Sequence, residues 1–115
     1  MFKTNSYKLG IAAEKLVADQ FQSLGFSLIA KRYKTKYGEI DLIVSRKNLL
    51  IFVEVKARSK VTPIETLISQ RQIDRNYSAA EFFLAEFPHY SSYSCRFDLV
   101  VLYRDKISQH IVNII

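Results

Sequence analysis

The chain has 115 residues, of which 49% are hydrophobic, enough for the core of one domain over residues 1–115. A single cysteine, Cys95, excludes an internal disulfide and favours a reducing compartment, and no apolar run is long enough to predict a membrane span. Seventeen Lys and Arg against eleven Asp and Glu give a net charge of +6, which favours nucleic acid as a partner. The N-terminal residues have no apolar signal-peptide core, so we expect a cytoplasmic protein.

The first predicted element is a helix that begins after a cap at Asn5 or Ser6, runs to Leu24 and stops at Gly25. Glu14 lies on the shoulder of its apolar stripe, so we expect this carboxylate at the edge of the core. The side chains expected on the buried side are Leu9, Ala13, Leu16, Val17, Gln20 and Leu24.

The remaining chain alternates between strand and helix patterns. Pro88 ends the second predicted helix, and the short join at 46–48 makes the second and third strands an antiparallel hairpin. This order, α-β-β-β-α-β-β, predicts the α/β class with a mixed central sheet flanked by helices. The expected strands are 26–33, 39–45, 49–56, 96–103 and 107–114, with the second helix over 64–87.

The hairpin contains charges where apolar side chains are expected. Asp41 lies inside the run 40–44, and Glu54 and Lys56 end the run that starts at Leu49. Charges in strands this apolar are costly unless they are paired or bind a ligand. If the turn is centred between residues 47 and 48, strand alternation puts Asp41 opposite Glu54 and Glu39 opposite Lys56, all on one face.

Two carboxylates facing each other across a ladder repel, so we expect a compensating group. A shared proton, Lys56, or a divalent cation would serve, and carboxylate oxygens suit magnesium or manganese. Such a site suits phosphodiester hydrolysis, in which Lys56 stabilises developing negative charge. The alternative is purely structural. Lys56 pairs with Glu39 or Glu54 at the rim of the sheet, Asp41 caps a bulge or loop, and Glu14 is a solvated helix residue.

The spacing of these residues resembles a nuclease motif. Asp41, twelve intervening residues and then Glu54-Val55-Lys56 resemble the D…E-x-K core of the PD-(D/E)XK nuclease superfamily. The longer string is similar to the bacterial YraN-like family, which is regarded as distantly related to archaeal Holliday junction resolvases. That string consists of Gly10 and Glu14, the block 38–43, the block 52–58 and the block 96–98.

The resemblance implies a restriction-endonuclease-like fold and a magnesium- or manganese-dependent endonuclease acting on DNA, including branched or structured DNA. It implies that Asp41, Glu54, Glu14 and the carbonyl of Val55 are metal ligands and that Lys56 is the catalytic lysine. A module that keeps the fold without catalysis, or RNA as the substrate, is the alternative. The sequence departs from the family's pattern at two places. The family usually has a lysine near the position of Gln72, where Arg71 or Arg75 substitutes for it here. The family also usually has a glycine in the loop after the third strand, whereas the loop 59–63 of this chain contains none.

Basic residues surround the hairpin and are expected to contact phosphates. The candidates are Arg32, Lys34, Lys36, Arg58 and Arg71. Tyr33 and Tyr37 either stack on an unpaired base or pack against the core. Glu39 pairs with Lys56 or lies behind the metal ligands, and Asp98 is expected to form a structural ion pair with Arg96. Cutting both strands together would require a symmetric dimer, for which the sequence indicates no interface.

Overall fold

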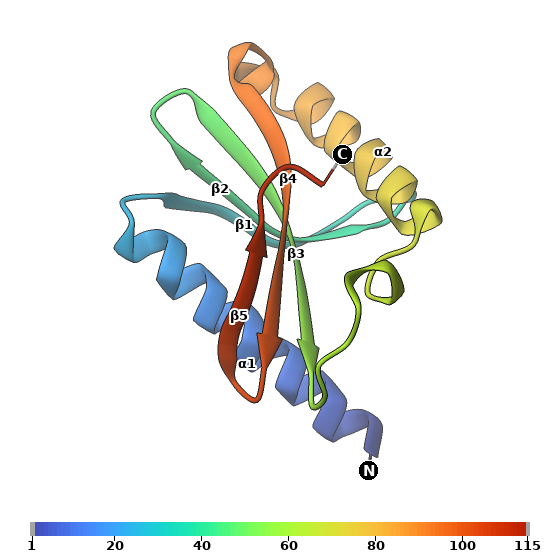
Figure 1. The fold of residues 1–115 in the computed structure, drawn as a ribbon. Coiled ribbons are helices and arrows are strands. Elements are labelled where there is room, and N and C mark those ends of the chain that lie inside the picture. Colours follow the sequence, from blue (N-terminus) through green and yellow to red (C-terminus); the bar gives the residue numbers. More distant parts are fainter. Residues whose placement is uncertain (1, 115) are drawn as a thin grey trace.

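The computed structural model describes residues 2–114, with side chains from Leu9 onward. One five-stranded sheet, in the order β1-β2-β3-β4-β5, lies between two helices (Figure 1). This mixed α/β architecture and the element order confirm the prediction from the sequence. The elements are α1 (Phe2–Ser23), β1 (Ser27–Lys34), β2 (Glu39–Arg46), β3 (Leu49–Arg58), η1 (Ile64–Thr66), α2 (Gln70–Glu86), η2 (Pro88–Ser92), β4 (Ser94–Tyr103) and β5 (Lys106–Ile111).

The sheet is mixed because one of its pairings is parallel. β1, β2 and β3 form an antiparallel meander, β3 and β4 run parallel, and β5 returns antiparallel to β4. Parallel neighbours need a crossover connection, and α2 provides it. Because strand residues alternate faces, Leu42 and Val44 pack towards α1 while Ile43 packs towards α2. Asp41 and Glu54, at the open end of the hairpin, alternate onto the same face as Ile43 and therefore lie on the α2 side of the sheet.

The first helix differs from its prediction in two ways. It begins at Phe2, so the helix runs through Asn5 and Ser6 instead of being capped there. Its end at Gly25 is as predicted: Gly25 has φ 90°, and the amide of Phe26 bonds the carbonyl of Phe21, a Schellman ending.

The buried side of α1 was predicted wrongly in part. Leu9, Leu16 and Leu24 are exposed by 57%, 42% and 51%. Phe21, whose ring packs edge-on against Phe26 with centroids 5.3 Å apart, turns the helix so that a different stripe faces the sheet. That stripe consists of Ala13, Val17, Ala18 and Phe21. As a result Glu14 lies beside the buried stripe.

The second helix is shorter than predicted. The segment from residue 64 is first a 3₁₀ turn, and α2 begins at Gln70 because the hydroxyl of Ser69 accepts a hydrogen bond from the amide of Gln72. A serine with this bond is an N-cap, which fixes where the helix starts. None of the helices in the described part of the chain is long and apolar enough to cross a membrane.

Candidate active site

The β2–β3 hairpin has the predicted register. Its ladder runs from Arg46 opposite Leu49 to Leu42 opposite Val53, so the next pair would be Asp41 and Glu54. The backbone ladder stops before that pair. There a carboxylate oxygen of Asp41, Oδ2, accepts the amide hydrogen of Val55 at 2.8 Å. The strands thus separate at the two acids, and a side chain replaces the missing backbone acceptor.

Glu54 is held by three side chains at the start of the crossover. Its Oε2 lies 3.0 Å from Lys56 Nζ and accepts a hydrogen bond from Gln72 Nε2 at 2.7 Å. Lys56 Nζ also donates to Gln72 Oε1 at 3.2 Å, which closes a triangle. Asn76 Nδ2 lies 3.5 Å from the other oxygen of Glu54. Glu54 and Lys56 are therefore oriented by α2 as well as by β3.

Asp41 is the acid with the least compensation. Burial, the charge of Glu54 and the charge of Glu14 raise the pKa of Asp41, against the opposing effects of the Val55 amide and Lys56, to about 7. A carboxyl with this pKa binds a proton or another cation readily at neutral pH. When ionised, Asp41 and Glu54 carry two negative charges, and Lys56 offsets one of them, so one negative charge is left without a partner.

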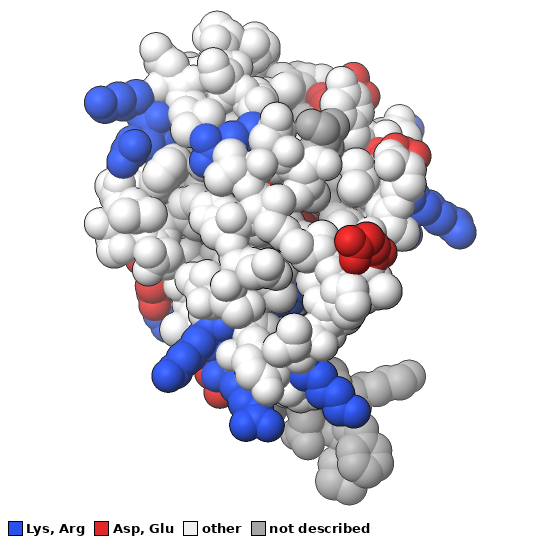
Figure 2. Space-filling view, in the orientation of Figure 1, with Lys and Arg blue, Asp and Glu red and all other residues white. Residues whose placement is uncertain are grey.

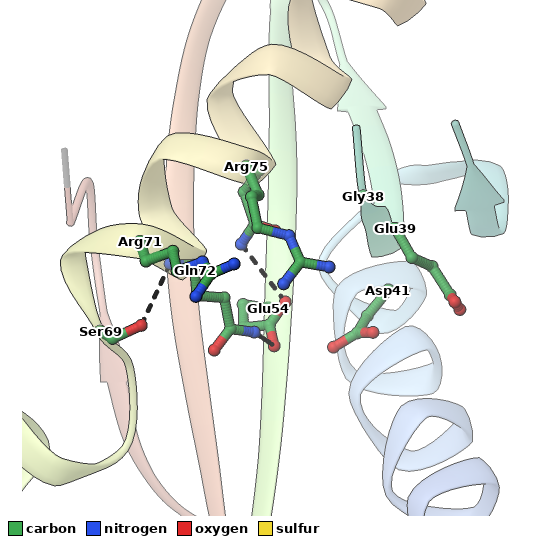
Figure 3. Close-up of a pocket in the computed structure, with 9 residues that line it drawn as sticks. Gly38, Glu39, Asp41, Glu54, Ser69, Arg71, Gln72 and Arg75 are labelled. Carbon is green, nitrogen blue, oxygen red and sulfur yellow. Dashed lines mark hydrogen bonds between the residues drawn. The ribbon is translucent and has the colours of Figure 1, made fainter. Parts of the chain in front are cut away.

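Asp41 and Glu54 open into a pocket of 350 Å³ between the hairpin and α2. Figure 3 shows that Arg71 and Arg75 approach from α2 while Glu39 and Asp41 come from β2. The pocket therefore has acids on its floor and cations on the α2 side, a suitable arrangement for a metal-bound phosphate.

Glu14 is engaged by Arg32, a residue predicted to contact phosphate. Arg32 Nε lies 2.8 Å from Glu14 Oε1. Arg32 has φ 52°, which L residues avoid, and lies between the ladder pairs of Lys31 with Leu42 and Tyr33 with Ile40. This irregular backbone in β1 turns the guanidinium towards α1. The third acid is thereby attached to the edge of the site by an ion pair.

The remaining predicted cations fall into two groups. Lys34 and Lys36 are exposed at the entry to β2. Arg58 donates to the carbonyl of Ala57 and lines a second pocket of 680 Å³ beside α1, together with Lys56. Figure 2 shows basic side chains gathered at the end of the molecule where β3 leaves the sheet and β4 turns into β5. Lys56 therefore lies between this second pocket, which it lines, and the first pocket, whose residues Glu54 and Gln72 it contacts.

The two tyrosines before the hairpin have different environments. Tyr33 packs against Phe83, with ring centroids 5.2 Å apart, and its hydroxyl donates to Glu86. Burial and this carboxylate raise the pKa of Tyr33 to about 12. Tyr37 is 46% exposed. Tyr37 is thus the more exposed of the two tyrosines, and Tyr33 is half-buried against the core.

Gln72 and Asn76 are site residues to which the sequence analysis gave no role. They are four apart, so they share one face of α2, and this spacing was the available signal. Among the residues whose side chains are described, no group of three or more His, Cys, Asp and Glu is placed to hold a metal ion. Asp41 and Glu54 with the carbonyl of Val55 are the oxygen donors at hand, and their chemistry fits a hard divalent cation.

Comparison with known proteins identifies the family. Residues 13–102 match the Uncharacterised protein family UPF0102. A UPF0102 protein of Rhodopseudomonas palustris strain BisB18 is 37% identical over 106 residues, which cover 92% of this chain and 78% of the relative. A UPF0102 protein of Azorhizobium caulinodans is 36% identical over 109 residues, which cover 95% and 83%. The chain belongs to the UPF0102 (YraN-like) family, part of the restriction-endonuclease-like superfamily.

Proposed function

We propose that this member of the UPF0102 family is a metal-dependent endonuclease that hydrolyses phosphodiester bonds in DNA. The observation that carries the proposal is the opposed pair Asp41 and Glu54 in a pocket walled by arginines, with Lys56 Nζ 3.0 Å from Glu54. Two opposed acids that share one lysine within a basic protein are a suitable place for a divalent cation and a phosphate.

Magnesium or manganese would be held by Asp41, Glu54 and the carbonyl of Val55. When bound, such an ion polarises a phosphoryl oxygen and lowers the pKa of a coordinated water. Glu14 pairs with Arg32, so its role as a further ligand requires that ion pair to open or to be shared.

The chain's own groups have separate tasks in this proposal. Lys56 stabilises the negative charge that develops on the phosphate, because Glu54 and Gln72 hold its ammonium beside the acids. Gln72 keeps Lys56 and Glu54 in register. Arg71 and Arg75 bind phosphates of the substrate strand and fix its position without reading its sequence.

The test is cleavage of end-labelled DNA by the purified protein with magnesium or manganese. The substrates are single-stranded, duplex, flap and junction DNA of equal length. We expect Lys56→Ala to reduce the rate by about 100-fold or more while binding persists. Lys47→Asn is the matched control: it removes the same charge at the opposite end of the hairpin and suits the φ of 56° found there, so its rate should stay near wild type.

A non-catalytic DNA-binding module is the second candidate. The engagement of Glu14 by Arg32 and of Glu54 by Lys56 favours it, because these acids already have partners. Calorimetry separates the two functions. Binding of one divalent ion that is lost in Asp41→Asn supports the nuclease, whereas absence of metal binding together with uncut DNA in every substrate would falsify it.

A further inference from the structure

We propose that Tyr37 and Phe82 form a stacking site for an unpaired base, so that the preferred substrate is DNA with a single-stranded nucleotide next to a duplex. This inference rests on the proposed function, because it names the class of DNA that the same pocket receives. Tyr37 lies in the loop before β2, directly before the pocket residue Gly38, and Phe82 lies on α2.

The two rings are an exposed aromatic pair. Their centroids are 6.4 Å apart with an interplanar angle of 62°, and the side chains are 46% and 40% exposed. On the same helix Phe83 is 2% exposed and packs against the ring of Tyr33. Tyr37 and Phe82 therefore present an angled aromatic step to solvent, on which a planar base can stack against one ring and contact the other.

Cations connect this step to the pocket. Lys36 Nζ lies 5.2 Å from the centre of the Tyr37 ring. Arg75 Nε donates to the carbonyl of Tyr37 at 3.4 Å, and Arg75 also lines the pocket over the acids (Figure 3). An aromatic ring flanked by cations that follow one path is the usual surface for a nucleic-acid strand. An apolar peptide has no negative charge to pair with Lys36 and Arg75, whereas a nucleotide has a phosphate, so the surface favours a nucleotide.

The distance from Tyr37 to Asp41 limits how far the stacked base can lie from the cleaved bond. Tyr37 is four residues from Asp41, so their Cα atoms are at most about 14 Å apart. A strand advances roughly 3.4 Å per stacked nucleotide. The stacked base is therefore within about four nucleotides of the cleaved bond. In a continuous duplex that base would have to be unpaired first, which costs a few kcal/mol, and a flap or junction avoids this cost.

The close approach at Gly38 keeps the step against the helix. A Cβ built at Gly38 would lie 3.4 Å from Cβ of Arg75. At this distance a Cβ would be in van der Waals contact with the helix, so the backbone at Gly38 lies directly against α2. The loop that carries Tyr37 is thus held against α2 at the side chain that lines the pocket.

The experiment measures binding without metal, so that cleavage does not interfere. Fluorescence anisotropy compares a labelled duplex carrying a three-nucleotide flap with a fully paired duplex of equal charge. We expect Tyr37→Ala to weaken flap binding about 10-fold and duplex binding less than 2-fold, while Tyr37→Phe binds like wild type. Tyr77→Ala is the matched control, because Tyr77 is 50% exposed on the same helix, and it should change neither affinity.

An abasic flap completes the test as a double-mutant cycle. Removing the flap bases should weaken binding to wild type by as much as Tyr37→Ala does and should have no further effect on Tyr37→Ala. Equal loss for flap and duplex, or no loss, overturns the stacking site. If duplex binding and cleavage persist in that case, the proposed nuclease function stands. If wild type binds neither DNA, both proposals fail.

Discussion

Two carboxylates of the sheet, on strands that β3 separates, differ in how their negative charge is compensated. Asp98 on β4 is fully buried, and it accepts hydrogen bonds from Arg96 at 3.0 and 3.2 Å, from His110 at 2.8 Å and from the amide of Asn113 at 3.0 Å. Asp41 accepts a hydrogen bond from the backbone amide of Val55 and faces a second acid. Asp98 is fully buried and Asp41 is half-buried, yet only the more deeply buried Asp98 has its charge compensated on several sides, so the balance of partners is the distinguishing property.

The largest expected effect is on the free energy of unfolding when Asp98, whose charge is compensated, is removed. Asp98→Ala removes the acceptor that serves Arg96 and His110, so we expect the free energy of unfolding to fall by about 3 kcal/mol in urea titrations. Asp19→Ala is the control: its pair with Lys15 is exposed, and its loss should be below about 0.5 kcal/mol. Similar losses in both variants would remove the contrast between the two carboxylates.

The second effect is a dependence of stability on pH that originates at Asp41. Its pKa is raised from 3.8 to about 7 on folding, so the folded state binds more protons than the unfolded state between these values. The resulting stabilisation is fully present below about pH 4 and is lost as the pH rises towards 7. From pH 5 to 8 we expect wild type to lose on the order of 2 kcal/mol in urea unfolding, from this carboxyl alone.

Asp41→Asn isolates this carboxyl, because asparagine keeps the shape and does not titrate. The difference in unfolding free energy between the variant and wild type should grow in favour of the variant from about pH 4 to about pH 7. A difference that stays constant with pH would show that Asp41 titrates normally.

The third effect is the response of stability to a divalent cation. At ten times its dissociation constant, a divalent ion that binds only the folded state should raise the unfolding free energy by about 1.4 kcal/mol. Thermal melts should show this shift in wild type and in Asp98→Asn but not in Asp41→Asn. A shift that survives in Asp41→Asn would place the ion elsewhere.

The smallest effect concerns the backbone beside the site. Arg32 has φ 52°, so Arg32→Gly should be more stable than Arg32→Ala by about 1 kcal/mol, although both lose the ion pair with Glu14. Urea titrations of the two variants give this difference directly. Equal stabilities would mean that β1 relaxes to a regular strand once the guanidinium is gone.

The sequence predicted the parts that depend on local pattern. Alternation and the length of the 46–48 join were sufficient for the hairpin register and for placing Asp41 opposite Glu54. The ion pair of Arg96 with Asp98 was predicted for the same reason, since residues two apart share a strand face, and the structure confirms it.

The sequence did not predict the parts that depend on packing between elements. The rotation of α1 follows from the contact of Phe21 with Phe26. The pairing of Arg32 with Glu14 requires a left-handed residue inside a strand, which no propensity of arginine indicates. Gln72 reaches Glu54 only because the crossover brings the start of α2 to the end of β3.

The bond from the Val55 amide to Asp41 gives the protein a spectroscopic reporter of its own site. The hydrogen on Val55 points at the carboxylate whose charge changes with proton or cation binding. The ¹H–¹⁵N signal of this one amide should therefore move when the site gains or loses positive charge, and its exchange with solvent should slow when the carboxylate is fixed. One resonance would then follow occupancy of the site in solution, without any substrate or label.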